Sequence, residues 1–179
     1  MPAVTPPQPD TTRPALPLVI RPEHPEDGPA VERLHARAFG PGRFARTAFR
    51  LREGAEPLPD LSFVARVGTF LAGSVRIGPA QAGGRALLAL GPLTVDPSFE
   101  RRGIGSALMR TSLDAARNAG HGLVILVGDR PYYGRFGFVP VPPGRLTLPG
   151  PVDPARFLWL ELTDGAAQAV GGIVAGGSP

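Results

Sequence analysis

The chain has 179 residues, of which 42% are hydrophobic, so its length suits one domain with a sizeable core. Its 19 basic residues, all arginine, outnumber the 15 acidic ones, but they are scattered and form no basic stripe interleaved with aromatic residues, which argues against a nucleic-acid partner. The absence of cysteine excludes a disulfide framework and a cysteine metal site, and no apolar run approaches the ~20 residues of a membrane helix.

The N-terminal part of the chain is predicted to hold a leader, a strand and two helices. Residues 1–16 are rich in proline and poor in apolar residues, which is typical of a disordered or extended segment. An apolar triplet at 18–20 predicts a strand, and apolar residues at helical spacing predict a helix over 26–39. After a Gly-Pro-Gly break, a second and shorter helix is expected over 43–53, where four arginines cluster.

Three antiparallel strands are expected next. Residues 61–67 alternate as a half-buried strand does, and a turn at Gly68 joins them to a hairpin partner over 70–77. A long strand is predicted over 86–95. Gly91-Pro92 interrupts it, and we expect the strand to bulge at this point.

The glycine-rich segment after this strand is the most informative part of the chain. Asp96-Pro97 ends the strand, because proline cannot donate to a sheet ladder, and a helical pattern runs from Gly103 to Asn118. The loop at 101–106 places backbone N–H groups at the positive end of that helix dipole, where they suit an anion, above all a phosphate. Gly103 and Gly105 allow the main chain to approach such a ligand closely. Taken alone, the pattern is equally consistent with a tight strand-to-helix turn.

The remaining elements are expected to complete the sheet. A continuous apolar run at 123–127 predicts a strand buried on both faces. A short helix is expected over 129–135. The last strands are expected at 138–139 and 157–162, around the proline-rich loop 140–154.

The order of the elements predicts one domain of mixed α/β class over 17–163. Antiparallel strands followed by strand–helix–strand are typical of a mixed sheet with flanking helices. Residues 164–179 are rich in glycine and alanine and are expected to form a C-terminal tail. We expect a cytoplasmic protein with no metal and no membrane partner, and a homodimer stays open.

Two stretches of the sequence resemble a known family. The strand Leu93-Thr94-Val95, Asp96-Pro97 and the run from Arg102 to Leu108 resemble motif A of the GNAT N-acetyltransferases. Downstream, the run from Tyr132 to Phe138 is similar to the family's Tyr-x-x-x-Gly-Phe segment. Two motifs in the right order are far more specific than either alone, and the resemblance covers residues 17–163.

The resemblance implies a GNAT-like acyl-CoA N-acyltransferase fold, in which a mostly antiparallel central sheet has parallel strands that splay apart to admit the pantetheine arm of the cofactor. It implies that the protein transfers an acetyl group from acetyl-CoA to a primary amine of a small molecule or peptide. The amine would attack directly in a ternary complex. The residues implied in cosubstrate binding are Leu93, Thr94, Val95, Arg101, Arg102, Gly103, Ile104, Gly105 and Ser106.

The resemblance also assigns catalytic groups. Tyr133, four residues before Gly137, stands where the family has the acid that protonates the departing thiolate, with Tyr132 as the alternative. Many family members carry a glutamate on the motif A strand, whereas residues 88–95 contain no carboxylate. The base is therefore open. Besides a water relay, its candidates are Asp129, His35 and Glu32.

Two departures from the family pattern keep other functions open. The family has Gln or Arg three residues before the first glycine of the loop, and this chain has Glu100 there. With the missing strand carboxylate, Glu100 motivates a non-catalytic acyl-CoA-binding or interaction module as the alternative function. The net charge of +4 motivates a basic nucleic-acid-binding protein as a second alternative. We expect the first two helices and the loop 140–154 to determine which amine is accepted.

Overall fold

The computed structural model describes residues 17–177, so the leader expected at 1–16 lies outside the described residues. The strands are β1 (Leu18–Pro22), β2 (Phe63–Val67), β3 (Phe70–Ala82), β4 (Arg85–Val95), β5 (Leu123–Val127), β6 (Val139–Pro140), β7 (Leu146–Thr147), β8 (Phe157–Glu161) and β9 (Gly172–Gly176). The α-helices are α1 (Gly28–Phe39), α2 (Thr47–Arg50), α3 (Ile104–Asn118) and α4 (Arg130–Tyr133). None of the described helices is both long and apolar enough to cross a membrane.

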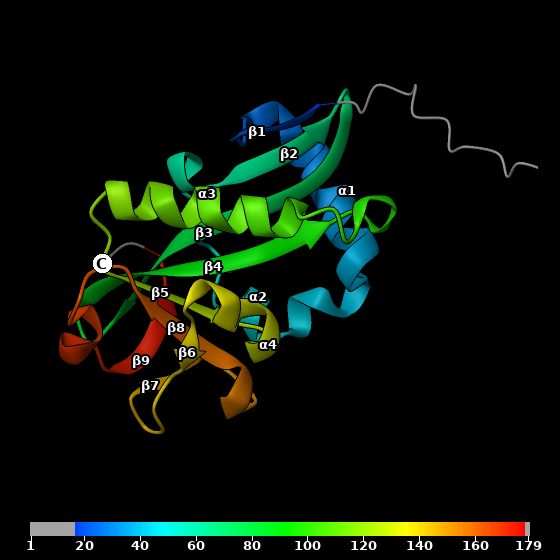
Figure 1. The fold of residues 1–179 in the computed structure, drawn as a ribbon. Helices are drawn as coiled ribbons and strands as arrows, with labels where there is room; N and C mark the ends of the chain where they lie inside the picture. The colour runs from blue at the N-terminus through cyan, green and yellow to red at the C-terminus, as the bar shows by residue number, and fades with distance from the viewer. Residues whose placement is uncertain (1–16, 178–179) are drawn as a thin grey trace, which may run out of the picture.

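The strands form one mixed sheet (Figure 1). Its order is β1-β2-β3-β4-β5-β8-β6, and β9 pairs with the far end of β3 and with β7. The pairs along this order are antiparallel except β4 with β5, which is parallel, as is β7 with β9. The predicted mixed α/β fold with flanking helices is confirmed.

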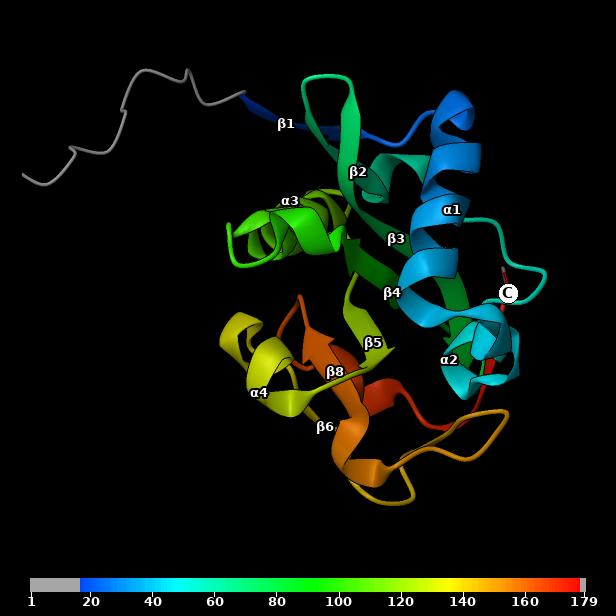
Figure 2. The same cartoon turned by 90° about the vertical axis from the view of Figure 1, so that its right-hand side faces the viewer.

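Helices cover both faces of strands β2 to β4, with α3 on one side and α1 on the other (Figure 2). Leu108 of α3 lies in the same buried cluster as Val75 of β3, and neither side chain is exposed. On the opposite face, Leu34 of α1 packs with Val64 of β2, both again fully buried. Burial of this kind stabilises a fold by about 1.5–3 kcal/mol for each large aliphatic side chain.

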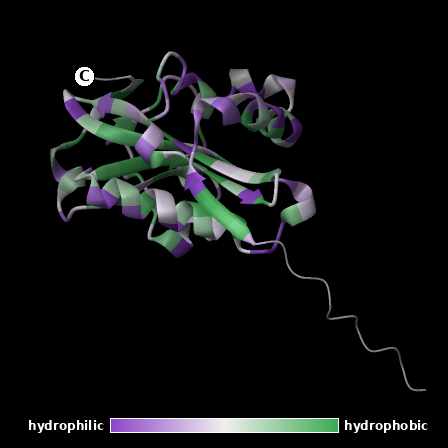
Figure 3. Cartoon of the chain, turned by 90° about the horizontal axis from the view of Figure 1, so that it is seen from above, coloured by the Kyte–Doolittle hydropathy of each residue, from purple (hydrophilic) through white to green (hydrophobic). Residues whose placement is uncertain are grey.

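The rest of the sheet has a second buried cluster. Ile125 of β5 and Trp159 of β8 pack there with Leu146 of β7 and Val174 of β9. Figure 3 shows that hydrophobic residues follow the strands, whereas the helices alternate between hydrophilic and hydrophobic positions. Both clusters include residues of β4 and β5, so the two strands are packed together where they pair.

The single helix predicted over 43–53 is wrong. The chain instead forms a 3-10 helix, Pro41–Ala45, and then the one-turn helix α2. Arg46 between them is extended, with φ −74° and ψ 139°, which breaks the run of helical hydrogen bonds. The residues after α2 therefore form an irregular turn that lies against β4 instead of continuing along one helix axis.

The C-terminal tail predicted over 164–179 also differs from the structure. Ala166–Ala169 form a 3-10 helix, and β9 follows, antiparallel to Ala80–Ala82 at the end of β3. β3 itself is longer than predicted for this reason. Glycine is required in β9 because a Cβ at Gly176 would collide with the carbonyl oxygen of Leu51. Gly176, one of the glycines that suggest a tail, is thus required by close packing.

A buried carboxylate fastens the start of α1 to the edge of the sheet. Asp27 is 3% exposed and accepts hydrogen bonds from Arg21 at 2.7 and 2.9 Å, from Arg66 at 3.2 Å and from the backbone N–H of His24 at 3.0 Å. Burial alone would raise the pKa of Asp27. The hydrogen bonds from Arg21 and His24 and the two guanidinium charges outweigh it, and the pKa is lowered.

We predict that Asp27→Asn lowers the free energy of unfolding by about 1–3 kcal/mol, because two guanidinium groups lose their charged acceptor. Urea denaturation at pH 7 measures this, and the exposed neighbour Glu26 provides the control, Glu26→Gln. Since the pKa of Asp27 is lowered in the folded state, the difference should persist above the unfolded value of about 3.9 and vanish as the pH falls through the folded value. Equal stability of Asp27→Asn and wild type at pH 7 would contradict the prediction.

Candidate active site

Strands β4 and β5 touch over only a short length. Their pairing consists of Leu88 with Val124 and Ala89 with Ile125. The other edge of β4 stays paired with β3 as far as Val95. Beyond Ala89, β4 therefore has a free backbone edge facing the gap between the two strands, and buried backbone groups need a partner.

The predicted bulge at Gly91-Pro92 is confirmed at the mouth of this gap. Val75 of β3 lies opposite Leu93 and Ile77 lies opposite Leu90, so the register shifts across these two residues. Gly91 has φ +126°, a conformation that favours glycine. The bulge turns the free edge of β4 toward the gap.

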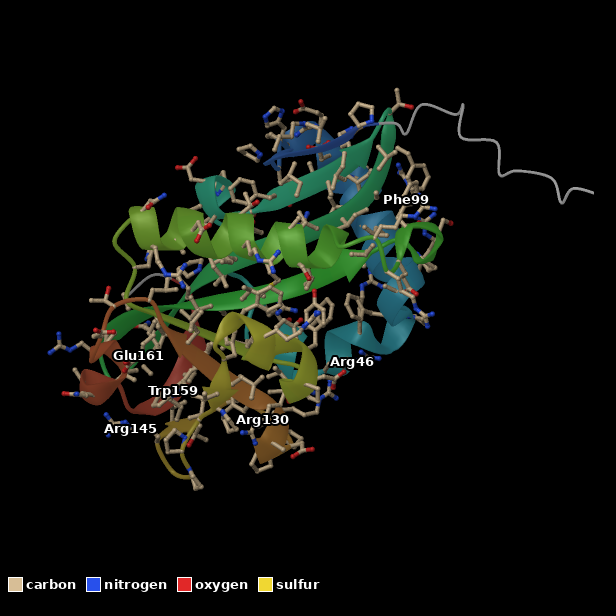
Figure 4. The ribbon with its side chains drawn as sticks, in the orientation of Figure 1. Arg46, Phe99, Arg130, Arg145, Trp159 and Glu161 are labelled. Carbon is tan, nitrogen blue, oxygen red and sulfur yellow. The ribbon has the colours of Figure 1, made fainter. Side chains whose placement is uncertain are left out.

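The loop before α3 adopts the conformation expected of an anion site. Arg101 and Gly103 both have positive φ, +60° and +76°, and Gly103 is the N-cap of α3. No side chain caps this helix, so its first backbone N–H groups stay open to a ligand. Arg101 and Arg102 are exposed, and the Arg102 guanidinium carbon lies 5.3 Å from the ring centre of Phe99 (Figure 4). The loop therefore offers main-chain donors with two arginine side chains beside them.

Tyr132 of α4 lies against the start of α3, which follows this loop. A Cβ placed on Gly105 would lie 2.7 Å from the Tyr132 hydroxyl oxygen, so glycine lets the two elements approach. Burial raises the pKa of Tyr132, against the opposing effect of a hydrogen bond with Ser106. The two sequence motifs, far apart along the chain, thus meet at the start of α3.

Tyr133 is held on the other side of α4. Its ring lies flat against Gly128, where a Cβ would collide with it, and meets the Tyr132 ring edge-on at 4.9 Å and the Phe138 ring at 6.0 Å. Burial, then the neighbouring Tyr132 and Asp129, raise the pKa of Tyr133 to about 12. Its hydroxyl is therefore protonated throughout the neutral range.

Tyr133 lines a pocket of about 500 Å³, here called the interstrand pocket, between the bulge of β4 and the end of β5. The walls come from four parts of the chain, including the turn around α2 and the segment 151–153. The lining residues are Phe39, Arg46, Thr47, Ala48, Phe49, Arg52, Leu90, Gly91, Pro92, Leu93, Val127, Gly128, Asp129, Tyr133, Pro151, Val152, Asp153 and Arg156. Its size suits a small ligand.

A second pocket of about 400 Å³, here called the bulge pocket, adjoins it. Its lining includes His35, Arg76 and Glu53, and it shares Phe49, Arg52, Gly91 and Pro92 with the interstrand pocket. Arg52 is central to both. Its guanidinium carbon lies 4.9 Å from the ring centre of Phe49, and burial lowers its pKa to about 10. The group remains charged at neutral pH.

The three candidate bases have different surroundings. Asp129 is exposed in the interstrand pocket and forms an ion pair of 3.2 Å with Arg156. Glu32 lines the bulge pocket, where Arg76 holds it at 2.7 Å. His35 is buried beside it, with Nε2 3.2 Å from the Ser74 hydroxyl, and burial followed by the charge of Arg76 lowers its pKa to about 4.

The structure brings most of the predicted site residues together. Leu93 and Val95 lie on the free part of β4, the loop 101–106 lies at its end, and Tyr133 lies across the gap. The side chain of Thr94 is buried, and Glu100 is exposed. Sequence reasoning missed Arg52 and Gly128. The arginine cluster in 43–53 is visible in the sequence, but the turn that directs one of its members inward is not.

Comparison with known proteins agrees with this geometry. The model of the acetyltransferase (GNAT) family matches residues 29–138. The Escherichia coli protein named uncharacterized N-acetyltransferase YhbS is 29% identical over 159 residues, which span 88% of this chain and 95% of that protein. The Escherichia coli N-acetyltransferase YjhQ, also named uncharacterized, is 30% identical over 118 residues, 64% of this chain and 65% of that protein.

Solved structures show the same relationship. The crystal structure of Escherichia coli YhbS in complex with CoA matches with a TM-score of 0.78 and 30% identity, and 94% of each chain is covered. A GNAT family acetyltransferase from Brucella melitensis in complex with acetyl-CoA matches with a TM-score of 0.66 and 28% identity over 91% of this chain and 97% of that one. The family model covers more than half of the chain and the structural match covers nearly all of it, so the chain belongs to the GNAT family of N-acetyltransferases.

Proposed function

We propose that the protein is a cytoplasmic enzyme that transfers the acetyl group of acetyl-CoA to a primary amine of a small molecule or peptide, by direct attack in a ternary complex. The observation that carries this proposal is the gap between β4 and β5, which joins the uncapped start of α3 to a pocket lined by Tyr133. The relatives solved with CoA and with acetyl-CoA support the choice of cosubstrate.

The residues around the gap fit such a cosubstrate. Backbone N–H groups of 101–106 suit a pyrophosphate, and the side chains of Arg101 and Arg102 can add charged donors. The free edge of β4 at Leu93 and Val95 can pair with the amides of a pantetheine arm as a neighbouring strand would. Bound acetyl-CoA supplies a thioester, and a main-chain N–H near Val95 is suited to stabilise charge that develops on its oxygen.

Tyr133 is proposed to assist the departing thiolate. Because its pKa is raised to about 12, its hydroxyl enters the reaction protonated and acts as a hydrogen-bond donor. Complete transfer to a thiolate whose conjugate acid has a pKa of about 8.5 is uphill, so the donation matters most while negative charge develops on sulfur. Gly128 keeps the ring in place for this by leaving room for it.

Asp129 is proposed as the base that receives a proton from the attacking ammonium. It shares the interstrand pocket with Tyr133 and is exposed, so it can pass the proton to bulk water. His35 fits this role less well, because it is buried and lines the bulge pocket, which Tyr133 does not line. Glu32 likewise lines only the bulge pocket.

The test of the function is incubation with acetyl-CoA and a mixed amine library, while released thiol and the masses of acetylated products are followed. We expect thiol release that depends on an amine and matches the acetylated product in amount. CoA binding with no turnover of any amine would favour a non-catalytic acyl-CoA-binding module. Salt-sensitive binding of oligonucleotides without CoA binding would favour a nucleic-acid-binding protein.

We predict that Gly105→Val weakens CoA binding at least about tenfold in calorimetry, because a side chain would then stand where main chain and ligand must meet. The matched control is Gly28→Val in the first turn of α1, where a Cβ meets nothing within 4 Å. Because a Cβ at Gly105 would also stand 2.7 Å from the Tyr132 hydroxyl oxygen, the unfolding midpoint of each variant is measured first and CoA is titrated well below it. Unchanged CoA affinity in folded Gly105→Val would remove the loop from the binding site.

We predict that Tyr133→Phe lowers kcat by about 10²–10³ while CoA affinity and stability hold, because the ring keeps its packing and only the hydroxyl is lost. Tyr132→Phe should lower kcat much less. Single-turnover kinetics on an authentic acceptor isolate the chemical step. A Tyr133→Phe enzyme within about twofold of wild type in that step would mean that water or the substrate protonates the thiolate.

A further inference from the structure

Arg52 differs from the other arginines around the two pockets. Arg76 pairs with Glu23 and Glu32, and Arg156 pairs with Asp129, at distances between 2.6 and 3.2 Å. Arg46 has no such pair among the described residues, but it is exposed to solvent on the segment that leads into α2 (Figure 4). Arg52 is half-buried and, within residues 17–177, has no carboxylate at ion-pair distance and no side-chain hydrogen bond to the protein.

The position of this guanidinium is fixed by its neighbours. One side faces the ring of Phe49, and Nη1 lies 2.8 Å from the place where a Cβ of Gly91 would stand. The group therefore lies at the bulge of β4, on the wall shared by the interstrand and bulge pockets. A desolvated cation without a counter-ion is unfavourable, so the site is most stable when an anion occupies it.

We propose that the amine acceptor carries a carboxylate close to its nitrogen, and that this carboxylate pairs with Arg52 while the amine faces the bulge. The inference rests on the proposed acetyl transfer and names its substrate class, a small amino acid. The planar guanidinium presents N–H donors in a fork that matches the two oxygens of a carboxylate.

The surrounding charges favour a monoanion over a phosphate. Four arginines and four carboxylates line the two pockets together: Arg46, Arg52, Arg76, Arg156, Glu32, Glu53, Asp129 and Asp153. A single half-buried cation among balanced charges suits one negative charge. A dianion would need a second unpaired guanidinium that is shielded from water, but Arg46, the other unpaired arginine in the lining, is exposed to solvent, and the carboxylates nearby would repel the second charge.

The proposed pairing with Arg52 also distinguishes a free amino acid from a peptide as the acceptor. The amine at the N-terminus of a peptide has an amide next to it in place of a carboxylate, and the side-chain amine of a lysine in a protein has neither group close by. Either acceptor would leave Arg52 without its partner. Pockets of about 400 and 500 Å³ also have the size of a small-molecule site.

The experiment compares each protein amino acid with its own carboxamide as acceptor, in wild type, Arg52→Gln and Arg52→Lys. The control is Arg50→Gln, an exposed arginine two residues away that lines neither pocket. Replacing the carboxylate by an amide removes the negative charge and lowers the pKa of the neighbouring amine. A larger share of the amide therefore carries an unprotonated amine, which favours its acetylation and works against the expected preference for the acid. The measured quantity is the ratio of kcat/KM for the acid to kcat/KM for its amide in the same variant. Because both values scale with the concentration of folded protein, partial unfolding does not change the ratio.

We expect wild type and Arg50→Gln to prefer an acid over its amide by roughly 10- to 100-fold, the usual effect of a hydrogen-bonded charge pair. Arg52→Gln should lose this preference through a lower kcat/KM for the acids. Arg52→Lys should retain part of it. An acid-to-amide ratio unchanged by Arg52→Gln, or a wild type that prefers amides or peptides, would overturn the proposal.

Two further arms make the result decisive. The first arm compares kcat/KM for 2-aminoethyl phosphate with kcat/KM for ethanolamine. If this ratio depends on Arg52 and exceeds the ratio of amino acid to amide, the anion is a phosphate and the carboxylate assignment is wrong. If no amine is acetylated, the proposed function fails, and calorimetry of N-acetyl amino acids and their amides on the CoA-bound protein still tests Arg52. Tighter binding of the acids that Arg52→Gln abolishes would support the anion site, and equal binding would overturn it.

Discussion

The whole arrangement depends on two neighbouring strands that stop pairing. β4 is held by β3 along its length, whereas β5 holds it only at Leu88 and Ala89. The bulge at Gly91-Pro92 then changes the direction of β4, and β5 ends at Val127 and leads into α4. A sheet that closed here would satisfy its backbone groups internally and leave no site. Because it stays open, the groups of β4 are available to a ligand that can pair as a strand does.

Burial has the largest effect on the charge of three titratable groups around this opening. Burial is the largest influence on Tyr133, on His35 and on Arg52, and in each case it disfavours the charged form. Tyr133 and His35 are consequently neutral at pH 7, and only Arg52, with a pKa of about 10, keeps its charge. A hydroxyl that stays protonated and a half-buried, unpaired guanidinium are what a reaction that releases a thiolate and binds an anionic acceptor would need.

The parts of the site that use main chain could be predicted from the sequence, and the parts that use side chains on irregular segments could not. Gly103 marks the loop because its φ of +76° favours glycine, and Gly105 marks it because a Cβ there would stand 2.7 Å from the Tyr132 hydroxyl oxygen. The Tyr133 motif is recognisable at once. Arg52 is one of several arginines in 43–53, and only the extended residue Arg46 and the short α2 direct it toward β4. Likewise, the glycines of β9 suggest a tail, although Gly176 is needed for close contact with Leu51.

Because the site has a main-chain part and a side-chain part, the structure of a relative gives little information about the acceptor. A loop and a strand edge that bind through backbone N–H and C=O groups tolerate many side chains, so proteins about 30% identical can share them in full. The pocket proposed for the acceptor is built in part from the turn around α2 and from residues 151–153, where the backbone is irregular and each side chain counts. Specificity is a difference of affinities that one guanidinium can change by orders of magnitude. The informative comparison between relatives is therefore whether an unpaired cation stands at the β4 bulge, beside the position of Gly91, and not the overall similarity of the fold.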